Sequence, residues 1–110
     1  MRQYLIDELK TEEVKRIREQ LERYCEPSPM EGLYWLPVPD DLLAEIQCQH
    51  PQCRPYYFSI ELGERFVKFE LLIRSRVNLR CSCIAYANRA QRDFLFHFAD
   101  KILEEARVTI

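Results

Sequence analysis

The chain has 110 residues, a formal net charge of −2 and a hydrophobic content of 47%. This length and composition are typical of one globular domain, and no apolar run is long enough to cross a membrane. We therefore expect residues 1–110 to form a single domain, and the mildly acidic balance excludes the strongly basic class of nucleic-acid-binding proteins.

The N-terminal segment and the cysteine count indicate a reducing compartment. The first ten residues contain Arg2, Asp7, Glu8 and Lys10, so they lack the uncharged apolar stretch of a secretory signal peptide. The five cysteines are odd in number, and a domain of this size does not need disulfides to hold its core. We expect a cytoplasmic protein with reduced thiols.

The first half of the chain predicts two helices and one strand. Apolar residues recur at helical spacing over 11–25, which predicts an amphipathic helix. The segment 32–38 is typical of a strand, and Pro37 suggests a sheet edge or a strand end. A short helix is expected over 40–46, followed by a turn-rich segment over 48–55.

The second half predicts three strands and a long helix. Polar and apolar residues alternate over 56–62 and 66–73, and a further strand is expected over 79–86. The last helix is predicted over 88–106, with Asn88 as its N-cap in a capping box. Its apolar surface is unusually broad, which suggests burial against a second subunit. That surface comprises Phe94, Leu95, Phe96, Phe98, Ala99, Ile102 and Leu103.

This order of elements predicts an α+β fold. We expect a two-layer domain with an antiparallel, three- to four-stranded meander sheet. An N-terminal helix and a long C-terminal helix should pack on one face of that sheet.

The most distinctive feature of the chain is a pair of cysteine clusters. Cys48, His50 and Cys53 lie in the turn-rich segment, and Cys81 and Cys83 follow in the predicted strand. Thiolates and imidazoles are the ligands that zinc prefers, so these five residues are candidate metal ligands. The spacing is looser than in a double C-x-x-C motif, and no glycine lies nearby to form a knuckle turn.

The favoured alternative is that Cys81 and Cys83 belong to the core, while Cys48 and Cys53 lie in a mobile or solvent-facing turn. On a strand over 79–86, Cys81 and Cys83 would share the apolar side with Leu79 and Ala85. Free cysteine is among the most buried residue types, so such a row would pack under the last helix. A redox pair is disfavoured because i,i+2 residues on a strand stand too far apart to bridge, and no C-x-x-C motif is present.

Aromatic and arginine side chains form a second candidate feature, a binding surface. Its members are Trp35, Tyr57, Arg74, Arg76 and Arg80. Arginine and aromatic residues on an open sheet can stack single-stranded nucleic acid, but the same residue types are enriched at protein interfaces. We consider nucleic acid the less favoured partner because the chain is mildly acidic and carries no RNA-binding signature.

The sequence contains none of the common catalytic or nucleotide-binding motifs, so we do not expect an enzyme. The leading hypothesis is a small cytosolic, non-catalytic interaction or adaptor domain that forms a homodimer and needs no cofactor. The alternative is a zinc-stabilised binding domain, contacting protein or nucleic acid, that uses Cys48, Cys53, Cys81 and Cys83.

Overall fold

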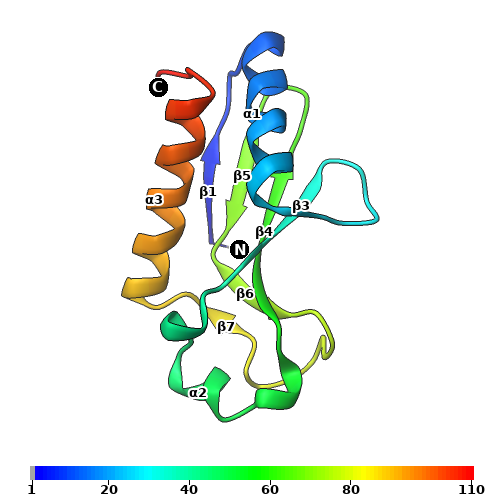
Figure 1. Ribbon diagram of the computed structural model, residues 1–110, viewed down its shortest axis with the longest axis vertical. Coiled ribbons are helices and arrows are strands. Elements are labelled where there is room, and N and C mark those ends of the chain that lie inside the picture. The colour runs from blue at the N-terminus through cyan, green and yellow to red at the C-terminus, as the bar shows by residue number, and fades with distance from the viewer. Residues whose placement is uncertain (1) are drawn as a thin grey trace.

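A computed structural model describes residues 2–110, which form two long helices over one face of an antiparallel sheet (Figure 1). Within this range no helix has both the length and the apolar character of a membrane span. The elements in chain order are β1 (Gln3–Ile6), α1 (Thr11–Tyr24), β2 (Glu26–Pro27), β3 (Leu33–Pro37), η1 (Asp40–Leu42), α2 (Glu45–Cys48), η2 (Pro51–Cys53), β4 (Tyr56–Leu62), β5 (Val67–Glu70), β6 (Leu72–Ser75), β7 (Ala85–Tyr86) and α3 (Arg89–Glu105).

The sheet has seven strands, so the expectation of three to four strands is wrong. The strand order is β1-β5-β4-β3-β2, and β6 pairs with β4 and with β7. All pairs are antiparallel, and the expected meander is confirmed in part: β4 pairs with β5 as a hairpin, and β3 lies on the other side of β4. The additional strands are β2, which has two residues, and β1, which has four and lies where the sequence suggests either a short strand or an extra turn. Segments this short carry too little alternation to be recognised from sequence.

The predicted strand over 66–73 is interrupted at Leu71. Its backbone N–H donates to the carbonyl of Arg2 at 3.1 Å, and its carbonyl accepts from the N–H of Ala87 at 2.8 Å. The edge of β5 and β6 that faces away from β4 therefore changes its neighbour at Leu71. Before Leu71 the neighbour is the N-terminal strand β1, and after it the C-terminal strand β7. On the other side, both β5 and β6 pair with β4.

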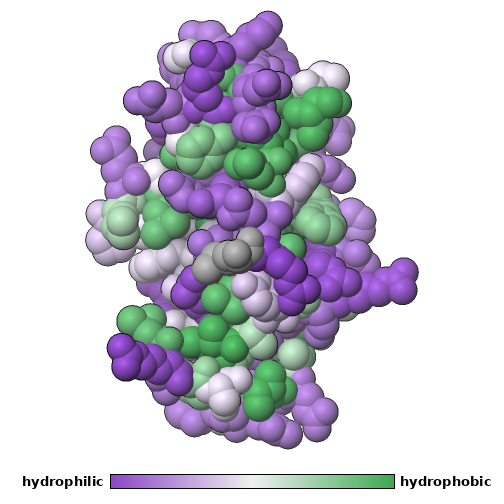
Figure 2. Space-filling view, turned by 180° about the vertical axis from the view of Figure 1, so that it is seen from behind, coloured by the Kyte–Doolittle hydropathy of each residue, from purple (hydrophilic) through white to green (hydrophobic). Residues whose placement is uncertain are grey.

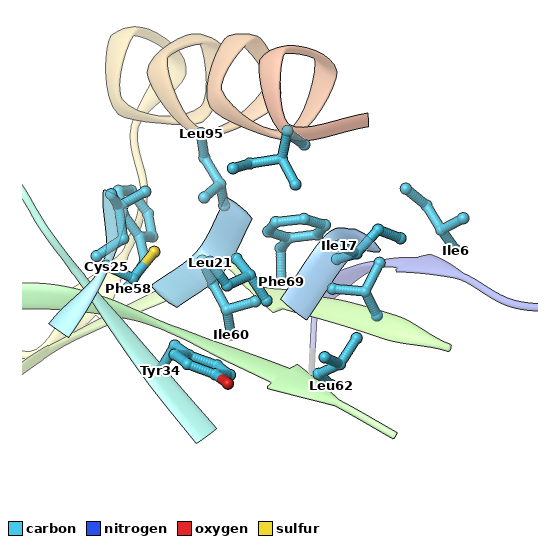
Figure 3. Close-up of a cluster of buried hydrophobic side chains, with 14 of the residues drawn as sticks. Ile6, Ile17, Leu21, Cys25, Tyr34, Phe58, Ile60, Leu62, Phe69 and Leu95 are labelled. Atoms are coloured by element: carbon cyan, nitrogen blue, oxygen red, sulfur yellow. The ribbon is translucent and has the colours of Figure 1, made fainter. Parts of the chain in front are cut away.

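The core lies between the sheet and the two long helices. Figure 3 shows Ile17 and Leu21 of α1, Leu95 of α3, and Phe58 and Phe69 of the strands converging on one space. All five are completely buried. Burying a side chain of this size stabilises the fold by about 1.5–3 kcal/mol relative to leaving it exposed, so this layer supplies most of the driving force.

The broad apolar surface of α3 is largely covered within the chain. Each of its three phenylalanines meets an aromatic ring of another element: Phe94 meets Phe58, Phe96 meets Tyr4 and Phe98 meets Tyr24, with ring centroids 5.3 to 6.5 Å apart. The breadth of the helix surface thus has an intrachain cause, because α3 packs beside β1 and α1 as well as over the sheet.

Two buried glutamines fix the segment that leads to the cysteine clusters. The Gln47 side-chain oxygen accepts from the Ala44 N–H at 2.8 Å and from the Gln91 amide at 3.0 Å. The Gln91 amide also donates to the Leu42 carbonyl at 2.9 Å. Gln91 completes the predicted capping box as well, since its side-chain oxygen accepts from the Asn88 N–H. One side chain thereby joins α3 to η1 and α2.

We expect Gln91→Met to lower the free energy of unfolding by about 1–3 kcal/mol, because it removes the side-chain donor to the Leu42 carbonyl and one of the two donors to the Gln47 oxygen. Gln49→Met is the control, since Gln49 is exposed on the next turn of the chain and should change stability by less than about 0.5 kcal/mol. Urea unfolding followed by circular dichroism measures both. Equal stability of the two variants would contradict the buried network.

Candidate metal centre

Three sulfur atoms from two distant segments meet beside η2. The Sγ atoms of Cys53, Cys81 and Cys83 all lie within 4.8 Å of one another. Tetrahedral zinc with Zn–S bonds of about 2.3 Å places its sulfurs about 3.8 Å apart. The three thiols therefore stand within about 1 Å of the separation that a shared metal ion requires.

The segment that carries two of these thiols is a loop, so the predicted strand over 79–86 is wrong. Only Ala85 and Tyr86 are extended and paired, and the chain turns repeatedly before them. Leu79 is 75% exposed, so it does not form a buried row with Cys81, Cys83 and Ala85. Polar and apolar residues alternate over this stretch, but the turns break the two-residue period that a strand needs.

A buried serine connects this loop to η2. The Ser75 hydroxyl donates to the carbonyl of Cys53 and accepts from the N–H groups of Val77 and Asn78 at 3.2 and 3.0 Å. The Asn78 amide then donates to the Cys53 sulfur at 3.8 Å. The start of the loop is therefore held against the turn that carries the first thiol.

The two loop cysteines differ in ionisation. The backbone N–H of Cys83 donates to the Cys81 sulfur at 3.5 Å, and this bond lowers the pKa of Cys81 to about 7. Burial instead raises the pKa of Cys83 to about 11. Cys81, which is half-buried, is thus the thiol that ionises first and the natural entry point for a cation.

Tyr56, at the start of β4, lies beside Cys83. Its hydroxyl donates to the carbonyl of His50 at 3.1 Å, and the residue is only 2% exposed. Burial, followed by the hydrogen bond to Cys83, raises the pKa of this phenol. Sequence reasoning missed Tyr56, Ser75 and Asn78, because each is placed by contacts across the chain and no local pattern marks it.

The structure divides the five predicted metal ligands. Cys53 is 1% exposed, which corrects the expectation that it lies in a solvent-facing turn. Cys48 is exposed at the end of α2 with its sulfur 3.9 Å from the Leu43 carbonyl, outside the group of three. His50 is half-buried, is also outside that group, and has Nδ1 2.8 Å from the Ile46 carbonyl.

Part of the predicted binding surface assembles on the sheet. Trp35 on β3 and Tyr57 on β4 have ring centroids 5.4 Å apart. The guanidinium of Arg76 lies over the Trp35 ring, 4.1 Å from its centroid. The structure therefore brings together three of the five residues that the sequence nominated, as one stack.

The arginines of this surface are paired with acids of the same chain. Arg76 meets Glu26 at 2.6 Å and Arg74 meets Glu70 at 3.5 Å. Arg80 lies apart from them, exposed in the loop after β6. Because two of the three charges are neutralised locally, the surface does not favour a phosphate backbone, whose binding depends on unpaired cations.

Comparisons with family models, with curated proteins and with solved structures find no match to this chain.

In reduced, metal-free protein we expect Cys81 to react with iodoacetamide at a rate that rises through about pH 7 and then levels off. Only the thiolate attacks, and the pKa of Cys81 is lowered to about 7. Cys83, buried and with its pKa raised to about 11, should stay unmodified over the same range. Peptide mass mapping of quenched samples, in a Cys48→Ser background, measures both sites; faster modification of Cys83 would contradict the assignment.

Proposed function

We propose that this protein is a small binding domain whose loop between β6 and β7 is held by a zinc ion. Cys53, Cys81 and Cys83 supply the thiolate ligands. The observation that carries this proposal is the grouping of their three sulfurs within 4.8 Å. Thiolate-rich, four-coordinate sites favour zinc over magnesium or calcium, which prefer oxygen ligands.

Hydrogen-bond donors aimed at the sulfurs favour a metal centre over simple core packing. Core packing accounts for the burial of Cys53 and Cys83. It gives no reason for the Asn78 amide to approach one sulfur or for the Cys83 N–H to approach the sulfur of Cys81. Such donors stabilise thiolates, the form in which cysteine binds a metal.

The role supported for the zinc ion is structural. The loop over 76–84 has no regular secondary structure and exposes Val77 and Leu79, so it buries little apolar area of its own. A metal that bridges this loop to η2 would supply the missing stabilisation, because zinc that binds only the folded state adds its binding energy to folding.

We expect the reduced protein to bind one zinc ion per chain and to lose stability on chelation. Cys81→Ser and Cys81→Ala should be equally harmful, since each deletes a ligand, whereas Cys48→Ser should behave as wild type. At free zinc one hundred times the dissociation constant, bound zinc contributes about 2.7 kcal/mol. Native mass spectrometry gives the stoichiometry, and thermal unfolding with and without chelator gives the stability.

A protection experiment locates the ion in the same samples. Zinc should shield Cys53, Cys81 and Cys83 from alkylation and leave Cys48 reactive. If no zinc binds, and if serine at position 81 is harmful while alanine is tolerated, the thiols are core residues and the zinc proposal fails.

A second candidate function is partner binding, first of all self-association, through the sheet face that carries Trp35 and Tyr57. The stack of these rings with Arg76 favours it, because tryptophan, tyrosine and arginine are enriched at interfaces. Seen from behind, hydrophobic side chains reach the surface in patches separated by hydrophilic ones (Figure 2). The stack supports a dimer, whereas the broad apolar surface of α3 does not, because other elements of the same chain largely cover it.

If this face forms a homodimer, Trp35→Asp should give a folded monomer, while Met30→Asp, at an exposed loop position, should leave the dimer intact. Sedimentation velocity measures the mass, and circular dichroism shows that the variants fold. A wild-type protein that sediments as a monomer at high concentration would remove this candidate.

A further inference from the structure

We infer that His50 is the fourth ligand of the metal centre, binding through Nε2 and closing a site of three thiolates and one imidazole. This inference rests on the proposed zinc centre and names the residue that completes it. A group of three sulfurs leaves one tetrahedral position open, and the atom that fills it decides whether the ion is buried in protein or open to solvent.

The hydrogen bond at Nδ1 prepares the imidazole for this task. A backbone carbonyl only accepts, so the 2.8 Å contact with Ile46 requires Nδ1 to carry the proton. In the neutral ring this leaves the lone pair on Nε2. Among residues 2–110, Nε2 has no protein hydrogen-bond partner. A carbonyl on the far nitrogen is the usual outer partner of a metal-bound histidine, because it fixes both tautomer and ring orientation.

The backbone of His50 is already tied to two parts of the site. Its carbonyl accepts from the N–H of Cys53 at 3.0 Å, as part of the η2 turn, and from the hydroxyl of Tyr56. Tyr56 in turn contacts Cys83. The His50 backbone therefore contacts Cys53 directly and approaches Cys83 through Tyr56.

The competing donors are committed elsewhere. Cys48 is exposed, and its sulfur lies against the Leu43 carbonyl. The Asn78 side-chain oxygen accepts from the Arg80 N–H at 3.3 Å, and the Tyr56 hydroxyl donates to the His50 carbonyl. His50 lies outside the 4.8 Å group, so metal binding should draw the loop over 76–84 toward the imidazole. A site closed in this way has no free coordination position, which agrees with a structural ion.

Cobalt substitution tests this assignment. Reduced wild-type protein loaded with Co²⁺ should show the intense visible bands of a tetrahedral ion and sulfur-to-cobalt charge transfer. His50→Ala should weaken those bands and lower zinc affinity by at least about tenfold to a hundredfold, the loss expected even for an outer-shell partner. His50→Cys should restore tetrahedral bands with stronger charge transfer. Cys48→Ala is the matched control and should be silent.

The outcomes separate this inference from the zinc proposal beneath it. Wild-type protein that binds neither ion overturns both. Binding that His50→Ala leaves unchanged overturns only the role of His50, and a simultaneous loss in Cys48→Ala would assign the position to that thiol. If a variant fails to fold, X-ray absorption of the wild-type zinc protein identifies the ligands directly. Three sulfurs and one imidazole nitrogen support the inference. Four sulfurs, or three sulfurs with oxygen as the fourth ligand, refute it.

Discussion

The burial of β4 on both faces is the constraint on which the rest of the structure depends. Six of its seven residues are buried, and it pairs with β3 on one side and with β5 and β6 on the other. Phe58 and Ile60 anchor the core beneath the helices, whereas Tyr56 at the start of the strand contacts Cys83. The same strand therefore contributes side chains both to the hydrophobic core and to the surroundings of the cysteine group.

The cysteine group lies at the end of the sheet, at the edge of the hydrophobic core. The loop over 76–84 buries Cys83 but exposes Val77 and Leu79, so apolar burial stabilises its conformation only in part. Hydrogen bonds from Ser75 and Asn78 supply further stability. In the proposed zinc form, the metal ion would add to it by joining the loop to η2, because its binding energy contributes to folding.

Aromatic residues on α3 and on the sheet suggest a protein partner when only the sequence is considered. In the structure, other residues of the same chain contact them. Phe94, Phe96 and Phe98 each find a ring on another element, and Trp35 is covered in part by Arg76. These contacts are long-range, so the same residues appear as unsatisfied apolar surface when only the helix pattern is considered. The charge of Arg76 is likewise balanced by Glu26, which is far from it in sequence, whereas Arg74 pairs with the nearby Glu70.

The sequence by itself determined the elements whose signals are local. The bounds of α1, α3 and β4 follow from the spacing of apolar residues within one element, and the capping box at Asn88 follows from the polar residues at the start of α3. Only the tertiary structure decided that residues 79–84 form a loop, and that β1 and β7 share one side of the β5–β6 segment. It also decided which thiols meet. The physical reason is that these features arise from pairing and convergence between segments that are separate in the sequence. The spacing of apolar residues within one segment does not indicate which other segment it will pack against or pair with.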